Sequence, residues 1–180
     1  SWLEPLDALS TKFAQVRERT EALGRRPKFA VRVDITARPT AEQAWKEIQK
    51  GWELVDHEAV ARMYSANGGN GYSVGAARQA QFRGSDAPRD YRDLIVSPNV
   101  WGGFSFLRGG PALSIVGSYE EAAERLDELI DIGVDAFILA GTPHLEEAYR
   151  VGEEVLPLLR ARTTTAAPAE PAATPHFTVA

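Results

Sequence analysis

Two kinds of periodic pattern alternate along most of this 180-residue chain. The stretch FAVRVDIT at 29–36 places apolar and polar residues at alternate positions, which is the period of a β-strand. Residues 40–55 instead carry apolar side chains at helical spacing. Apolar runs at 112–117 and 134–141 predict two more strands, each followed by a helical pattern, and the continuous run at 134–141 predicts a strand buried on both faces. Strands that alternate with helices predict an α/β fold with parallel strands and helical crossovers.

Local signals set the ends of the predicted helices, which cover 5–23, 40–55, 118–132 and 142–160. Thr40 with Gln43, and Ser118 with Glu121, have the spacing of capping boxes. Gly133 follows the third helix, and glycine commonly ends helices. Three strand-helix units are too few to close a barrel of eight. The chain is therefore expected to be the C-terminal part of a larger fold or a small three-stranded α/β domain.

The pattern is interrupted by a long irregular section and ends in a tail of low complexity. We expect residues 1–160 to form one domain, with an insertion or lid at about 57–110. The glycine-dense GGNGYSVG at 68–75 has the wrong spacing for a dinucleotide-binding loop, so a surface loop is the favoured interpretation. Residues 161–180 are rich in Ala, Thr and Pro and are expected to be disordered.

Composition excludes several classes of function. The net charge is −5 and the basic residues are scattered, which argues against a nucleic-acid partner. The chain has no apolar run of the roughly 18 residues that span a bilayer, and we expect a cytoplasmic protein with no membrane partner. The absence of cysteine excludes disulfides and a cysteine nucleophile. His57, His144 and His176 lie far apart without a second ligand at metal spacing, so no metal site is predicted.

Three polar residues near strands are candidate site residues. Arg32 and Asp34 lie on one face of the first strand, with Thr36 beyond them. If both faces of the sheet are covered, this pair is either part of a ligand site or a buried ion pair. Thr142 follows the last strand at its carboxyl end, where α/β folds build their sites, although it could also cap the last helix.

A fourth candidate is the single charged residue in the stretch VWGGFSFLRGGPAL at 100–113, which is Arg108. A guanidinium keeps its proton and is poorly accommodated by apolar surroundings unless an anion or several acceptors contact it. The residues alone leave two interpretations open. Arg108 either binds an anion from a mobile loop or has a structural role.

Several longer segments resemble a known family. SPNVWGGFSFLRGG at 97–110, IVGSYEEAAERLDELIDIGVDAFILAG at 115–141 and TPHLEEAYRVGEEVLPLL at 142–159 resemble the C-terminal half of the alkanesulfonate monooxygenases, members of the bacterial-luciferase-like flavin superfamily. The resemblance covers about residues 2–160. It implies that the chain is the C-terminal portion of a TIM (β/α)8 barrel, from the end of the fifth strand to the eighth.

The resemblance also implies a chemistry. Reduced FMN would come from a separate NAD(P)H-dependent flavin reductase, and O2 would form a flavin peroxide that cleaves an organosulfonate to aldehyde and sulfite. Arg108 and Arg32 match arginines with a catalytic role in holding the sulfonate and the peroxyflavin, and Trp2 matches a tryptophan close to the bound flavin. Such an enzyme is expected to be a homo-oligomer, and this chain alone is expected to be inactive.

Two positions depart from the family pattern. Asp34 stands where the family usually has histidine, and Thr142 where it usually has tyrosine, so both are expected to reshape the substrate-binding pocket. The alternatives are another luciferase-like flavin or deazaflavin oxidoreductase, and a non-catalytic half-barrel remnant.

Overall fold

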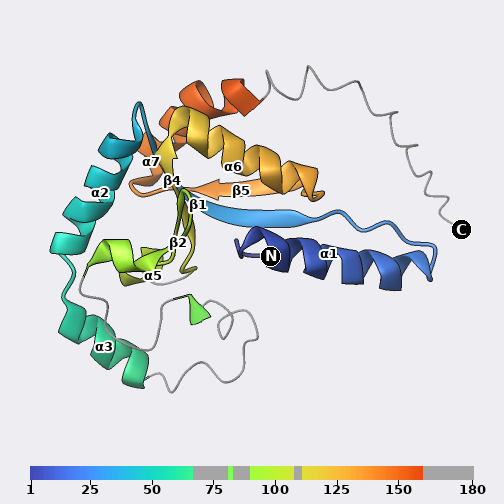
Figure 1. The fold of residues 1–180 in the computed structure, drawn as a ribbon, viewed down its shortest axis with the longest axis horizontal. Helices are drawn as coiled ribbons and strands as arrows, with labels where there is room; N and C mark the ends of the chain where they lie inside the picture. Colours follow the sequence, from blue (N-terminus) through green and yellow to red (C-terminus); the bar gives the residue numbers. More distant parts are fainter. Residues whose placement is uncertain (67–80, 83–89, 108–110, 160–180) are drawn as a thin grey trace, which may run out of the picture.

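The computed structural model describes residues 1–66, 81–82, 90–107 and 111–159 of the chain. A mixed five-stranded sheet lies at its centre, in the order β2-β3-β4-β1-β5 (Figure 1). The strands are β1 (Ala30–Arg38), β2 (Ile95–Ser97), β3 (Val100–Trp101), β4 (Ser114–Ser118) and β5 (Ala136–Ala140). The α-helices are α1 (Leu6–Glu21), α2 (Ala41–Glu53), α3 (His57–Ala66), α5 (Phe104–Leu107), α6 (Tyr119–Asp131) and α7 (His144–Arg150). A 3-10 turn covers Tyr91–Leu94, and a π turn at Val151–Val155 continues α7.

Strand β1 lies between β4 and β5 in the sheet. Its residues 34–38 pair in parallel with β4, and its residues 30–34 pair in parallel with β5. Residues 1–3 pair with the start of β1, on the same edge that β4 pairs with further along. Leu3 N donates to Arg32 O at 3.0 Å, and Arg32 N donates to Ser1 O at 2.8 Å. Both edges of β1 are therefore hydrogen-bonded, and α1 lies alongside the start of β1 while α2 begins at its end (Figure 1).

The α/β class, the parallel strands and the helical crossovers are confirmed. The barrel is not seen in the described part of the chain, where the sheet is open. In a barrel of strand-helix units, consecutive strands lie side by side, whereas here β1 separates β4 from β5. The β2-β3 hairpin also pairs antiparallel with β4, which makes the sheet mixed. Within the expected insertion, α3, the 3-10 turn, β2, β3 and α5 are regular structure.

Helices cover both faces of the sheet. The first face carries the odd-numbered residues of β1 and packs against α1, α6 and the end of the last helix, with a buried core that includes Leu9, Phe13, Val31, Val33, Ile35, Leu126 and Val155. The second face carries the even-numbered residues of β1. Over its β4 side pack α2 and α5. The second core there includes Ala44, Ile48, Trp52, Phe104 and Val116, together with Trp101 of β3. In a barrel, this second face would point toward the barrel interior, and all the helices would pack on the outside.

The predicted helix ends agree with the structure at three positions. The side chain of Thr40 accepts a hydrogen bond from Gln43 N at 3.2 Å. Ser118 and Glu121 form the full reciprocal capping box at the start of α6. Gly133 has a φ of 96°, a left-handed conformation that favours glycine and ends the helix.

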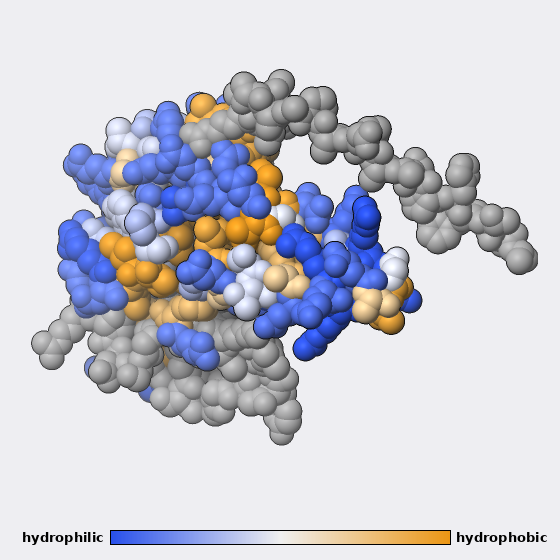
Figure 2. Space-filling view, turned by 45° about the vertical axis from the view of Figure 1, so that its right-hand side comes forward, coloured by the Kyte–Doolittle hydropathy of each residue, from blue (hydrophilic) through white to orange (hydrophobic). Residues whose placement is uncertain are grey.

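Strand β5 differs from its prediction. Its continuous apolar run predicted burial on both faces, but β5 is an edge strand of the described sheet and Ile138 is 61% exposed. On α7, Leu145 and Tyr149 are also exposed. In Figure 2, hydrophobic surface crosses the face in view between strongly hydrophilic regions. No helix within the described ranges has both the length and the apolar character needed to cross a membrane.

Substitutions at two glycines are expected to change the stability of the fold in opposite directions. Gly152 lies in the π turn and a Cβ there would meet nothing within 4 Å, so Gly152→Ala is expected to stabilise the fold by up to about 1 kcal/mol through helix propensity. At Gly103 a Cβ would lie 2.2 Å from the buried Trp101 ring, so Gly103→Ala is expected to destabilise by roughly 1–3 kcal/mol. Urea unfolding followed by circular dichroism measures both changes. A stable Gly103→Ala variant would contradict this packing.

Candidate functional site

The candidate site is a pocket of about 490 Å³ beyond the carboxyl ends of β1 and β5. In open α/β sheets, ligands bind outside the carboxyl ends of the strands because the loops there are free to shape a site. Thr36 and Arg38 line the pocket from β1, and Thr142 lines it from the segment after β5. The remaining lining comes from α2, the α2-α3 connection, α3 and α5, with Pro143 beside Thr142.

The pocket walls are mainly apolar. They are built by Ile48, Gly51, Leu54, Val55, Ala59, Val60, Phe104, Phe106 and Leu107. Hydroxyls of Thr36 and Thr142 and the guanidinium of Arg38 supply the hydrogen-bonding groups beside the strands, and two carboxylates, Glu47 and Asp56, lie on the helical side. An apolar cavity with a few polar groups is typical of small-molecule sites.

A buried carboxylate fixes the position of Arg38. Glu147 on α7 is 2% exposed, and its Oε1 lies 2.9 Å from Arg38 Nη2. Arg38 Nη1 donates to Glu147 Oε2 at 3.2 Å and to Ala37 O at 2.7 Å. Arg150 donates to Glu147 Oε1 at 2.5 Å. The absence of a side chain at Gly141 allows this approach, because a Cβ there would lie 2.4 Å from Glu147 Cβ.

The charges on the helical side of the pocket are also held in place. Lys50 donates to Glu47 at 2.8 Å, and this hydrogen bond lowers the pKa of the Glu47 carboxyl below its ordinary value. Asp56 Oδ1 accepts from Ala59 N at 2.8 Å at the start of α3. Each charged group of this region is therefore paired or hydrogen-bonded: Glu147 with Arg38 and Arg150, Glu47 with Lys50, and Asp56 with the Ala59 amide.

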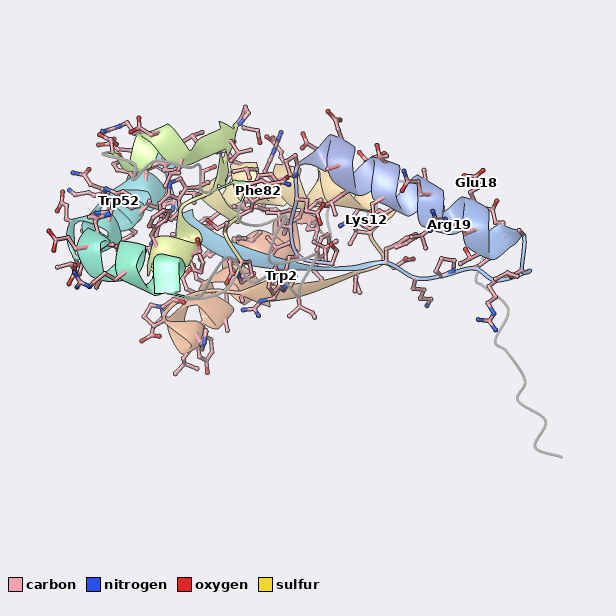
Figure 3. The ribbon with its side chains drawn as sticks, turned by 90° about the horizontal axis from the view of Figure 1, so that it is seen from below. Trp2, Lys12, Glu18, Arg19, Trp52 and Phe82 are labelled. Carbon is pink, nitrogen blue, oxygen red and sulfur yellow. The ribbon has the colours of Figure 1, made fainter. Side chains whose placement is uncertain are left out.

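A second cluster of polar side chains, Arg32 and Asp34, lies nearer the start of β1. Arg32 Nε is 3.9 Å from Asp34 Oδ2, and Asp34 is fully buried on the second face. Trp2 pairs with Arg32 across the strand edge, and Figure 3 shows Trp2 beside the sheet, well separated from Trp52 on α2. Ser114, the register partner of Asp34, is fully buried too. Within the described residues, Arg32 Nε and Ser114 Oγ are buried and make no hydrogen bond.

The structure therefore brings three predicted residues together and places a fourth elsewhere. Trp2, Arg32 and Asp34 are neighbours, whereas Thr142 lies at the carboxyl-end pocket. Asp34 and Arg38 are four residues apart on β1, or roughly 13 Å at the usual strand rise. Thr142 does not cap α7, because Pro143 is the N-cap residue and no side-chain capping bond forms. The site roles of these four residues stay predictions.

Other predicted features fall outside the pocket or outside the described residues. Arg108, the GGNGYSVG segment, His176 and the tail at 161–180 lie outside the described residues. His57 packs edge-on against Trp52 with ring centroids 4.6 Å apart, and His144 Nδ1 contacts Gly141 O. In the ranges that the structure describes, no group of three metal-ligating side chains occurs.

Sequence reasoning missed Arg38 and Glu147. By sequence, Glu146 and Glu147 are alike, because both are carboxylates that suit the first turn of a helix. The available signal was Arg150, which follows Glu147 by one helical turn and forms an ion pair with it. Arg38 was missed because it lies two residues beyond the predicted end of its strand.

Comparison with known proteins gives a likeness in fold. No family model matches the chain. This chain is similar to a solved structure of riboflavin lyase (RcaE), with modified FMN and substrate riboflavin. The TM-score is 0.58 and the sequence identity is 21%. The similarity covers 90% of this chain and 38% of the lyase, so the chain spans well under half of that neighbour. At this identity the likeness concerns the fold alone.

The predicted membership of the alkanesulfonate monooxygenases is wrong. No family model supports it, and the structural likeness is to a riboflavin lyase. Residues that carried the resemblance have local structural roles. Asn99 makes a turn with φ 61°, and Trp101 is buried with its Nε1 donating to Tyr91 O at 2.8 Å. Gly103 is needed beside the Trp101 ring, and Glu121 closes a capping box.

The Glu147 contact can be tested against its neighbour on the same helical turn. Glu147→Gln removes the negative charge between Arg38 and Arg150 and is expected to destabilise the fold by on the order of 3 kcal/mol, because a partly buried guanidinium loses its counter-charge. Glu146 is exposed, so Glu146→Gln is expected to change stability by less than about 0.5 kcal/mol. Urea unfolding at pH 7 measures both. Equal effects would contradict a structural role for Glu147.

Proposed function

We propose that this chain is the flavin-binding portion of a flavin-using enzyme, and that the carboxyl-end pocket holds the isoalloxazine ring. The single observation that carries the proposal is the apolar pocket of about 490 Å³ beside Thr36, Arg38 and Thr142. The fold likeness to a riboflavin lyase whose structure holds modified FMN supports it. The proposal includes no desulfonation.

The residues present fit the ring of a flavin. An isoalloxazine is flat, with apolar faces and one edge of carbonyl and ring-nitrogen groups. Apolar side chains of α2, α3 and α5 offer walls for the faces, and two hydroxyls and a guanidinium offer partners for the edge. The volume lies within the range of about 300–1,000 Å³ that small-molecule pockets have.

Each part of the lining has a distinct role in this proposal. Arg38, immobilised by Glu147, would donate to the polar edge of the ring and stabilise negative charge there. Thr36, near the end of β1, and Thr142, just after the neighbouring β5, would orient the same edge. Phe104 and Phe106 would exclude water from the opposite side. A bound flavin would supply electron or hydride transfer, which no side chain of this lining can provide.

Filling the pocket tests the proposal. Ala59 lies on the pocket side of α3, so Ala59→Trp is expected to weaken riboflavin binding at least tenfold by occupying the space of the ring. Ala14 is exposed on α1 and does not line the pocket, so Ala14→Trp is the matched control and is expected to bind like the parent chain. Flavin fluorescence titration measures the dissociation constants.

Two results would overturn the proposal. The first is that the parent chain binds neither riboflavin nor FMN, which would favour a non-catalytic role. The second is that Ala59→Trp binds flavin like the parent chain while circular dichroism shows an unchanged fold, since the ring would then occupy another place.

A further inference from the structure

A second hollow lies at the opposite end of β1 from the carboxyl-end pocket. Its volume is about 300 Å³, and it lies where the end of α1 meets the segment that leads into β1. Figure 3 shows this end of α1, marked by Glu18 and Arg19, well away from Trp52 on α2. The residues that line this basic hollow are Arg17, Glu21, Arg25, Arg26 and Pro27.

We propose that the basic hollow binds a compact anion of the phosphate class, about the size of a diphosphate. The two sites are built from different residues at opposite ends of β1, so this proposal does not depend on the flavin proposal.

The lining gives the basic hollow a net positive charge. Three guanidiniums line it, and arginine keeps its proton throughout the physiological pH range. Glu21 in the same lining supplies one carboxylate, which compensates one of the three guanidiniums. The chain as a whole has a net charge of −5, so this local excess is opposite in sign to the charge of the molecule. An anion is therefore the ligand that the lining favours.

Charges of both signs adjoin the lining without forming part of it. Arg19 and Lys28 are basic, and Glu18, Asp131 and Asp135 are acidic. Because Coulomb interactions weaken with distance and are screened by water, the groups that line the hollow act most strongly on a ligand inside it.

Arg17 is held in place by neutral groups. Its Nη2 donates to Ile132 O at 3.2 Å and to Gly133 O at 3.5 Å. Gly133 allows this approach, because a Cβ there would lie 1.9 Å from Arg17 Nη2. The guanidinium also lies 4.9 Å from the centroid of the Phe29 ring, which stacks on Phe13. A guanidinium held by carbonyls and a ring keeps its full charge, and its Nε and Nη1 hydrogens are separate donors for an oxyanion.

An ordered turn brings Arg25 and Arg26 back toward α1. Gly24 has a φ of 66°, in the left-handed region that favours glycine. Gly24 N donates to Glu21 O at 2.9 Å. Arg25 N donates to Thr20 O, also at 2.9 Å, and the two hydrogen bonds together form a Schellman motif. Because the backbone of both arginines is already ordered, binding an anion costs mainly side-chain entropy.

These arginines have one alternative role, which is to compensate the negative end of the α1 dipole. In that role any basic residue near the end of the helix is equivalent, whether or not it lines the hollow. Arg19 and Lys28 make the comparison possible, since they lie in the same region and carry the same charge but do not line it.

Calorimetric titration of the full 180-residue chain with inorganic pyrophosphate tests the proposal. The double variant Arg25→Gln, Arg26→Gln is expected to weaken pyrophosphate binding at least tenfold, because two charge-assisted contacts are lost. Both side chains are exposed, so circular dichroism is expected to show an unchanged fold. The double variant Arg19→Gln, Lys28→Gln removes the same charge outside the lining and is expected to weaken binding less than threefold.

Two results would show that the proposal is wrong. The first is that the parent chain does not bind pyrophosphate even at low salt. The second is that both double variants weaken binding equally, because the anion would then respond to the overall charge near the end of α1. Neither result bears on the flavin pocket, whose titration depends on other residues.

Discussion

The double pairing of β1 is the constraint on which the rest of the structure depends. Residues 1–3 and β4 pair with one edge of this strand, and β5 pairs with residues 30–34 on the other edge, so most of its backbone groups are hydrogen-bonded within the sheet. Because alternate side chains point to opposite faces, the odd residues enter one core and the even residues form a polar row from Arg32 to Arg38. The candidate pocket lies where that row ends.

The polar row accommodates a charged side chain in two different ways, at Asp34 and at Arg38. At Asp34 the carboxylate is fully buried and lies 3.9 Å from Arg32, away from the pocket. At Arg38 the guanidinium borders a pocket and is held from behind by a carboxylate. A guanidinium fixed in this way can donate hydrogen bonds to a ligand in the pocket without first reorganising.

The elements predicted from local patterns agree with the structure, because helix caps and side-chain periodicity depend on residues that are close in sequence. Ser118, Glu121 and Gly133 behave as predicted for this reason. The order of the strands depends on pairings between distant residues, and it placed β5 at an edge that its apolar sequence did not indicate. Glu147 was indistinguishable from Glu146 until the fold placed Arg38 opposite one of them.

The carboxylate of Glu147 also makes the pocket and the last helix thermodynamically interdependent. Arg38 lines the pocket and also forms an ion pair with Glu147 of α7. A ligand that stabilises Arg38 in its present position therefore also favours the docked position of α7. By reciprocity, whatever loosens α7 from the sheet lowers affinity at the pocket by the same factor. Arg38 and Glu147 are 109 residues apart in the chain, and their contact couples ligand binding at the pocket to the docking of α7.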